Sequence, residues 1–282
     1  MISIIIPAHN EENVIVRCLT PLLPGTKKKE FEIIVICNGC TDKTPRIVES
    51  FETVQLIETE LPSKTNALNL GDETASGFPR FYIDADIVIS LDAVRKVAHV
   101  LDSDRFLVAA PQVKMNFNYS SWFVKSYYDI WLNLSYIKEG LIGTGVYAVS
   151  QNGRARFKKF PDVVADDAYF RALYTDQEKY SVPDCYSEVT APATINDLLK
   201  IKKRSRLGLY ELWKKFPQLT SGIQKDTNYG IAIIELMQNI RLWHKIPVYL
   251  FVNILSRVKA GRHFTTHGAT GWERDLTNRK IL

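Results

Sequence analysis

Short apolar runs alternate with stretches of helical periodicity through the first half of the chain. The first run is unbroken and rich in isoleucine, as expected of a strand that is buried on both faces. The pattern predicts strands at residues 2–7, 32–37, 54–58 and 81–83, and helices at residues 11–23, 44–51 and 64–71. Alternation of this kind predicts an α/β fold, in which a mostly parallel central sheet carries helices on both faces.

The second half of the chain is patterned differently. Aromatic side chains are dense between residues 106 and 131, and residues 144–149 predict one more strand. Beyond residue 195 the chain is basic and helical. Since no internal repeat or low-complexity linker interrupts it, the sequence predicts one α/β domain over residues 1–225 with a helical C-terminal extension over residues 226–282.

The C-terminal extension contains two apolar stretches, residues 231–237 and 246–255. Between them lie cations and an aromatic side chain, namely Arg241, Trp243, His244 and Lys245. Interfacial helices combine cations, aromatic residues and an apolar face in this way. The extension is therefore expected either to pack on the core or to lie at a membrane surface.

Composition excludes several classes of protein. Of the 282 residues, 46% are hydrophobic and 24% are charged, which excludes a disordered or fibrous chain. The formal net charge of +5 is too small to indicate nucleic-acid binding. No run approaches the ~18 to 20 apolar residues of a membrane span, and the first residues lack a secretory pattern. We expect a cytoplasmic globular protein, peripheral on the inner face of the cell membrane if its extension is interfacial.

Asp84-Ala85-Asp86 is the most informative local feature, because it places two carboxylates at the end of a predicted strand. Two such carboxylates can share a divalent cation, and Mg²⁺ and Mn²⁺ prefer oxygen ligands. Solvated loop acids are the alternative, but apolar runs on both sides make unpaired acids costly here. Ligand sites in these sheets lie at the carboxyl ends of strands, so residues 9–12, 38–39 and 84–86 are expected to converge.

Four segments carry a more specific signal through their order, spacing and strand-end positions. They are Ser3-Ile4-Ile5-Ile6-Pro7-Ala8-His9-Asn10-Glu11-Glu12, Val35-Ile36-Cys37-Asn38-Gly39-Cys40-Thr41-Asp42, Lys64-Thr65-Asn66-Ala67-Leu68-Asn69 and Tyr82-Ile83-Asp84-Ala85-Asp86. The chain thereby resembles glycosyltransferase family 2, whose members are inverting, nucleotide-sugar-dependent enzymes of the GT-A fold. The resemblance continues through Gly143-Thr144-Gly145 and Asp166-Asp167 and covers roughly the first 210 residues.

The resemblance implies a role for each matching residue. The donor nucleotide would be bound by Pro7, Ala8, His9, Glu11, Asn38, Lys64, Asp84, Ala85 and Arg206. A Mn²⁺ or Mg²⁺ ion would be held by Asp86 and Asp84, with His267 as a further ligand. Asp167 would be the catalytic base with Asp166 beside it, and the acceptor pocket would include Gly143, Thr144 and Gly145. Asn38 stands where the family usually has an aspartate that reads uracil.

These roles predict a metal-dependent inverting glycosyltransferase. It would move a sugar from a nucleotide diphosphate, with UDP expected, to a glycan or lipid-linked acceptor in polysaccharide or glycolipid assembly. A cation neutralises the leaving diphosphate, and a carboxylate takes the proton of the acceptor hydroxyl. Two alternatives stay open: a retaining GT-A enzyme, which needs no base at Asp167, and a nucleotide-sugar-binding protein without turnover. Asp166 and Asp167 could also serve only as charges at a helix N-terminus.

Cys37-Asn38-Gly39-Cys40 matches the C-x-x-C pattern of zinc and redox sites. A zinc site would need a second pair of ligands, and only the isolated Cys18 and Cys185 remain. We therefore expect neither zinc binding nor redox chemistry at this pair.

Overall fold

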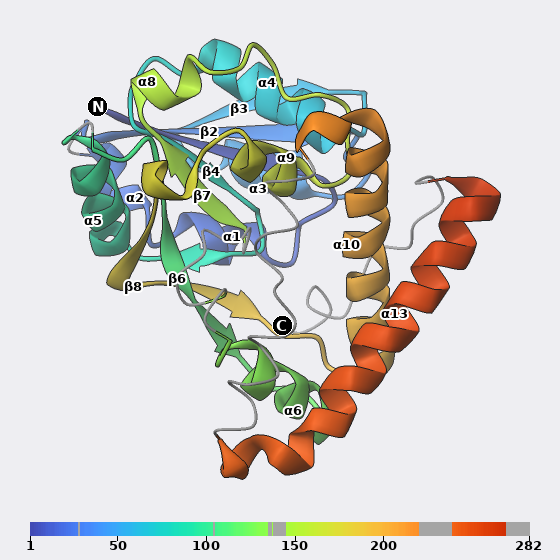
Figure 1. Cartoon of the computed structure of the whole chain (residues 1–282). Coiled ribbons are helices and arrows are strands. Elements are labelled where there is room, and N and C mark those ends of the chain that lie inside the picture. The colour runs from blue at the N-terminus through green and yellow to red at the C-terminus, as the bar shows by residue number, and fades with distance from the viewer. Residues whose placement is uncertain (28, 104, 135–136, 138–144, 220–238, 269–282) are drawn as a thin grey trace.

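The computed structural model describes residues 1–282 except 28, 104, 135–136, 138–144, 220–238 and 269–282. The strands are β1 (Ile2–Ala8), β2 (Phe31–Asn38), β3 (Val54–Thr59), β4 (Arg80–Ile83), β5 (Val88–Ile89), β6 (Val108–Asn116), β7 (Val146–Val149) and β8 (Lys179–Thr190). Within the described residues they form one eight-stranded sheet in the order β3-β2-β1-β4-β7-β6-β8-β5 (Figure 1). The predicted α/β fold with a central sheet is confirmed.

Helices cover both faces of the sheet. They are α1 (Ile15–Leu19), α2 (Leu23–Lys27), α3 (Thr44–Glu49), α4 (Lys64–Thr74), α5 (Leu91–Leu101), α6 (Trp122–Trp131), α8 (Gln151–Arg154), α9 (Asp166–Ala172), α10 (Ile195–Lys215) and α13 (Ile246–His267), with 3₁₀ turns η1 (Asp176–Glu178), η2 (Pro217–Leu219) and η3 (Ile240–Lys245). Helices α1, α3 and α5 share a core cluster with one face of the sheet, and α4 and α9 share one with the other. The predicted helix over residues 11–23 is too long, because Pro21 lacks the N–H that the next turn of α1 would need.

The N-terminal half of the sheet is parallel, as predicted. β1 pairs in parallel with β2 and with β4, so the ends of these three strands lie at one edge. Alternate residues of β1 enter different clusters: Ile4 and Ile6 pack on the side of α1, and Ile5 packs on the side of α4. Burial on both faces explains why the sequence of this strand is an unbroken apolar run.

The other half of the sheet is mixed. β7, within the predicted strand at 144–149, runs antiparallel between β4 and β6, and β8 pairs in parallel with β6. The sequence pattern did not predict β6 or β8. Their pairing shifts register between Pro111 and Gln112, and Asp184 has a positive φ of 50°, so neither strand keeps a regular alternation.

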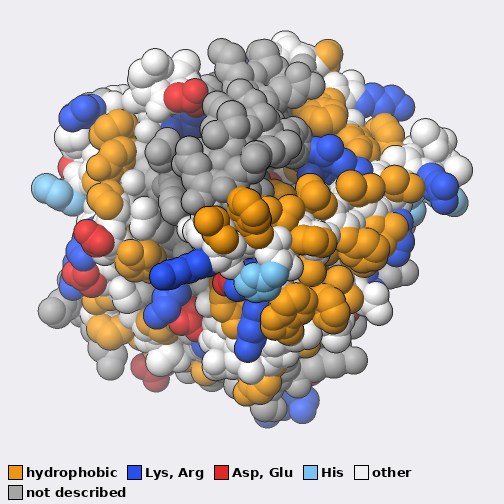
Figure 2. Space-filling view, turned by 60° about the horizontal axis from the view of Figure 1, so that its bottom comes forward, with side chains coloured by type: hydrophobic (Ala, Val, Ile, Leu, Met, Phe, Trp, Pro, Cys, Tyr) orange, Lys and Arg blue, Asp and Glu red, His pale blue; other side chains and the backbone are white. Residues whose placement is uncertain are grey.

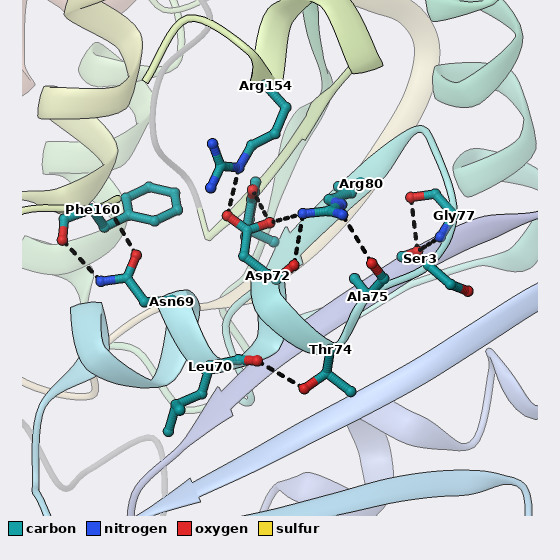
Figure 3. A network of polar contacts seen from close by, with 12 residues as sticks. Ser3, Asn69, Leu70, Asp72, Thr74, Ala75, Gly77, Arg80, Arg154 and Phe160 are labelled. Carbon is teal, nitrogen blue, oxygen red and sulfur yellow. Dashed lines mark hydrogen bonds and ion pairs between the residues drawn. The ribbon is translucent and has the colours of Figure 1, made fainter. Parts of the chain in front are cut away.

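A buried ion-pair network anchors α4 to the sheet (Figure 3). Asp72 of α4 accepts hydrogen bonds from Arg80 Nη1 of β4 at 2.7 Å and from Arg154 Nε of α8 at 2.6 Å. The hydroxyl of Tyr82 donates to the same carboxylate at 2.8 Å. The Asp72 side chain is only 3% exposed, so both arginines are needed to compensate its charge. The network holds the helix whose first residue is Lys64.

The C-terminal helices pack together at one side of the sheet, with α10 beside the strands and α6 below them (Figure 1). α6, α10 and α13 share an apolar cluster that includes Tyr127, Leu198 and Val252. The predicted domain boundary at residue 225 lies outside the described residues. In the described part of the chain, no helix is long and apolar enough to cross a membrane.

Candidate active site

The loops after β1 and β2 are joined by hydrogen bonds at the carboxyl edge of the sheet. Asn38, at the end of β2, donates from Nδ2 to the carbonyl oxygen of Ala8 at 2.8 Å. His9 Nδ1 lies 2.6 Å from the carbonyl oxygen of Asn38. Pro7 and Ala8, the last residues of β1, complete this corner, so four of the predicted nucleotide-binding residues lie together.

Glu11 is held against the start of α3. Its backbone N–H donates to Thr44 Oγ1 at 2.7 Å, and the residue is only 3% exposed. Asn10, which has a positive φ of 54°, accepts a hydrogen bond from the backbone N–H of Thr41 through its side chain. The two loops therefore form one interlocked surface beside the ends of β1 and β2.

The Asp84-Ala85-Asp86 segment leaves β4 at the same edge. Ala85 is buried, whereas Asp84 and Asp86 are each partly exposed. The N–H of Asp84 donates to the carbonyl oxygen of Gly145 at 2.8 Å, because the antiparallel strand β7 begins alongside the end of β4. Arg17 of α1 donates to the carbonyl oxygen of Asp86 at 3.2 Å. The backbone of the acidic segment is thus held from both sides.

Gly145 is the member of the predicted acceptor segment that lies within the described residues. Its φ is +82°, and a Cβ there would come within 2.7 Å of Ile87 Cγ1 and 3.2 Å of Asp84 Oδ2. Both the backbone conformation and the closeness of Asp84 require glycine. Gly143 and Thr144 lie outside the described residues.

Lys64 joins the acidic segment to the start of α9. Ser63 caps α4 by accepting a hydrogen bond from the N–H of Asn66, so Lys64 is the first residue of the helix. Its Nζ lies 2.8 Å from Asp84 Oδ1 and 3.1 Å from Asp166 Oδ2. The predicted donor-side and catalytic residues therefore meet at one ammonium group.

Asp166 and Asp167 begin α9 but differ in their surroundings. Asp166 is 3% exposed, and it contacts Lys64 and accepts a hydrogen bond from the hydroxyl of Tyr147 at 3.3 Å. Asp167 is half-buried, and its Oδ1 accepts a hydrogen bond from the N–H of Ala168. Asp166 is thus fully engaged inside the protein, whereas Asp167 keeps access to solvent.

Burial and neighbouring charges shift the pKa values at this site. Burial raises the pKa of Asp166 to about 6, although Lys64 acts in the opposite direction and Asp167 adds to the rise. Burial also lowers the pKa of Lys64, but Asp166 and Asp84 outweigh it and raise that pKa above its usual range. Lys64 is therefore a permanent cation at neutral pH.

Asp84 and Asp86 fit a hard divalent cation. Both offer partly exposed carboxylates, and the Lys64 ammonium already lies against Asp84 as a cation would. Among the described residues, no group of three or more His, Cys, Asp and Glu side chains could hold a metal ion. An ion bound here would complete its coordination shell with phosphate oxygens and water, which is how Mg²⁺ is commonly held.

Two further predicted residues make contacts within the C-terminal helices. Arg206, in the middle of α10, donates to Asn253 Oδ1 of α13 at 3.5 Å. His267, at the end of α13, lies against Thr266 and the ring of His263. The described residues do not group His267 with the two aspartates, so its role as a metal ligand stays a prediction.

Sequence reasoning missed Arg17 and Tyr147. Arg17 supports the backbone of Asp86, and Tyr147 contacts Asp166. A basic residue in an otherwise apolar helix was the available signal for Arg17. Tyr147 gave no such signal, because an aromatic residue in a buried strand is ordinary.

The structure brings the thiols of Cys37 and Cys40 together. The hydrogen bond with Cys37 lowers the pKa of the Cys40 thiol, and burial raises it. The hydrogen bond is the larger effect, so this pKa falls to about 7. Cys18 and Cys185 are buried free thiols. No metal-binding group of His, Cys, Asp and Glu includes the pair within the described chain.

The fold and the site define a protein of the GT-A type, and solved structures agree. Mannosyltransferase PcManGT from Pyrobaculum calidifontis, in complex with GDP-Man and Mn²⁺, is similar over 92% of this chain and 86% of that chain, with a TM-score of 0.66 and 18% identity. TarS 1-349 from S. aureus, in complex with UDP, is similar over 96% of this chain and 73% of that chain, with a TM-score of 0.53 and 16% identity.

The chain belongs to glycosyl transferase family 2, whose sequence profile matches residues 3–161. Glycosyltransferase AglE of Haloferax volcanii is 35% identical over 91 residues, which are 30% of this chain and 30% of that protein. The poly(ribitol-phosphate) beta-N-acetylglucosaminyltransferase TarS of Staphylococcus aureus is 28% identical over 106 residues, or 36% of this chain and 18% of TarS. The chain thus spans well under two thirds of either relative, and the family predicted from its motifs is confirmed.

Proposed function

We propose that the protein is an inverting, metal-dependent glycosyltransferase that uses a UDP-sugar donor. The observation that carries this proposal is the position of Lys64, between Asp84 of the donor side and Asp166 at the start of α9. This single contact joins two acidic segments that lie far apart in the sequence. A site that only bound a nucleotide would not need the second segment.

The two acids at the start of α9 have different roles in this proposal. Asp166 is buried and holds Lys64, so it positions the site. Asp167 is accessible and serves as the general base. The acceptor oxygen attacks the anomeric carbon, the bond from that carbon to the diphosphate breaks, and Asp167 takes the hydroxyl proton. General base catalysis contributes typically ~10² to 10⁴-fold to the rate.

The leaving diphosphate carries negative charge that the site must offset. Lys64 supplies one positive charge at the edge where β4 ends. A Mn²⁺ or Mg²⁺ ion held by Asp84 and Asp86 would supply the rest of the charge neutralisation as a Lewis acid. The Mn²⁺ in the PcManGT complex supports this metal.

The nucleotide would lie on the interlocked loops after β1 and β2. We propose that His9, Glu11 and Asn38 contact the base and the ribose, because hydrogen bonds hold these residues in the two loops beside Pro7 and Ala8. The TarS complex contains UDP and the PcManGT complex contains GDP-Man, so this fold accepts different bases. Similarity to TarS in both sequence and structure supports UDP.

The acceptor is proposed to be a hydroxyl in polysaccharide or glycolipid assembly. TarS is a poly(ribitol-phosphate) beta-N-acetylglucosaminyltransferase, and GgaA of Bacillus subtilis, 30% identical over 106 residues, is a minor teichoic acid biosynthesis protein. By name, one relative transfers N-acetylglucosamine to poly(ribitol-phosphate) and the other takes part in minor teichoic acid biosynthesis. Gly145, beside Asp84, would border the acceptor.

Calorimetric titration of UDP, GDP and ADP, each with and without Mn²⁺, tests the donor side. We expect tight binding of UDP that requires Mn²⁺ and is lost in Asp86→Ala. Asp92→Ala is the matched control, because Asp92 is an exposed acid on α5, and it should bind as the wild type does. Absence of binding by all three nucleotides would overturn the proposal, and a preference for GDP would replace UDP.

A further inference from the structure

Helix α13 is apolar on two opposite faces. Its inward face contains Tyr249, Val252 and Ala260, which are buried against α6 and α10. Its outward face carries Leu250, Phe251, Ile254 and Val258, whose exposed fractions are 46%, 53%, 61% and 44%. These outward residues recur at helical spacing over three turns. Each apolar face of a helix is normally covered by an apolar partner.

The outward face of α13 continues onto η3 and α6. Trp122 and Phe123 at the start of α6 are 53% and 50% exposed, and Ile240 and Trp243 of η3 are 73% and 50% exposed. The Trp122 ring stacks on His244 of η3, which connects the two elements. We call this surface the apolar face; it comprises Trp122, Phe123, Ile240, Trp243, Leu250, Phe251, Ile254 and Val258. Figure 2 shows hydrophobic side chains gathered there, with basic side chains around them.

Positive charge surrounds the apolar face. Residues 240–267 contain five Lys and Arg residues and no Asp or Glu, so this segment alone equals the net charge of +5 of the whole chain. An open groove between α10 and α13 is lined by Lys200, Lys203 and Lys259, of which Lys200 also pairs with Asp197. Lys259 directly follows Val258 of the apolar face. Cations therefore lie immediately beside exposed apolar side chains.

We propose that the apolar face docks the protein onto an anionic lipid bilayer, with α13 lying in the plane of the membrane surface. Leu250, Phe251, Ile254 and Val258 would enter the acyl boundary, and the tryptophans would sit at the headgroup level, where indole rings are favoured. The basic residues beside them match acidic headgroups. No helix of the described chain can span a bilayer, so the contact is at the surface.

Charge distinguishes a bilayer from a second copy of this chain. Lys245 already pairs with Asp129 of α6 at 2.6 Å. A two-fold interface through the apolar face would still bring the other cations of each segment together, and residues 240–267 contain no carboxylate to offset them. An anionic membrane offsets these cations. The docking inference does not depend on the proposed transfer reaction, since it uses neither the nucleotide site nor the catalytic acids.

Vesicle co-sedimentation of the full chain, without nucleotide or metal, tests the inference. We expect binding to phosphatidylcholine vesicles that contain phosphatidylglycerol, and at least about tenfold weaker binding to pure phosphatidylcholine or in high salt. The double variant Phe251→Ser/Ile254→Ser should reduce binding by a further factor of about ten. Leu61→Ser is the matched control, because Leu61 is an exposed leucine (54%) outside the apolar face, and it should bind as the wild type does.

Tryptophan fluorescence and light scattering complete the test. Anionic vesicles should shift the wild-type emission to shorter wavelength, because Trp122 and Trp243 leave water. The inference would be overturned if Phe251→Ser/Ile254→Ser bound anionic vesicles as well as the wild type does. It would also be overturned if the wild type neither sedimented with these vesicles nor showed the emission shift. A dimer in solution that this variant converts to a monomer would assign the apolar face to a second copy instead.

Discussion

Replacing Lys64 with methionine is the sharpest test of how the site is held together. Methionine keeps much of the side-chain length but removes the charge between Asp84 and Asp166. Asp166, which is 3% exposed, would then keep only the Tyr147 hydroxyl among its described partners. We expect Lys64→Met to be folded but destabilised, because a buried carboxylate has lost its counter-ion.

The size of the loss follows from distance and exposure. At the Asp84 and Asp166 distances of 2.8 Å and 3.1 Å, each pair attracts by about 5–6 kcal/mol at the effective dielectric of a protein surface. The Lys64 side chain is 41% exposed, so solvent screens much of this energy. Breaking a buried pair costs about 3–5 kcal/mol and an exposed pair about 0–1 kcal/mol, so we expect about 2 kcal/mol.

The loss should depend on pH in one direction. The pKa of Asp166 is raised to about 6 in the folded state, so the folded protein binds more protons than the unfolded chain between about pH 4 and 6, and this group's contribution to stability falls as pH rises there. Without Lys64 this pH range extends to higher pH, because the Asp166 carboxylate loses the charge that mainly stabilises its ionised form. The raised pKa of Lys64 itself affects stability only at alkaline pH. The deficit of Lys64→Met should therefore be larger at pH 8 than at pH 5.

Urea unfolding in EDTA would measure the effect for the wild type, Lys64→Met, Asp166→Asn and the double variant. We expect Asp166→Asn to cost less than Lys64→Met, since it removes a buried charge, and the coupling energy to be about 1–2 kcal/mol. Lys96→Met is the matched control; its pair with Asp92 is mostly exposed and should contribute under about 0.5 kcal/mol. The reasoning would be refuted if the losses of unfolding free energy in the two single variants added up to the loss in the double variant. It would also be refuted if the loss in Lys64→Met were larger at pH 5 than at pH 8.

Three further predictions concern other parts of the molecule. Asp72→Ala should lower the free energy of unfolding by about 3–5 kcal/mol in denaturant titrations, because it removes the buried carboxylate that pairs with two largely buried arginines, which are 13% and 15% exposed; a loss under about 1 kcal/mol would contradict this. Asp167→Asn should keep donor affinity in calorimetry and lose about 10² to 10⁴-fold in turnover, and near-normal turnover would exclude it as the base. Cys40→Ser should leave sugar transfer nearly intact in an activity assay, whereas a folded but inactive variant would indicate that the thiol takes part in function.

The parallel half of the sheet was predictable because its determinants are local. The strands β1 and β2 are mostly apolar runs, β3 is a shorter run rich in β-branched residues, and short helices separate them; their observed ends differ from the predicted ones by a residue. Strands of a parallel sheet end at one edge, so the convergence of His9, Asn38 and Asp84 followed from the order of elements alone. The family motifs lie on these same strand ends, so the order of elements brings the predicted donor-side residues to one edge, and their roles stay predictions.

What only the tertiary structure decided depends on contacts between distant segments. The family resemblance assigned the base to Asp167, but the residue pattern gave no physical difference between Asp166 and Asp167; packing against Tyr147 and Lys64 buries the first and leaves the second accessible. Periodicity likewise could not assign the faces of α13, because a helix with apolar residues on two opposite faces has no preferred inward side. Only the positions of α6 and α10 determine that Val252 is buried and that Ile254, two residues later, faces outward.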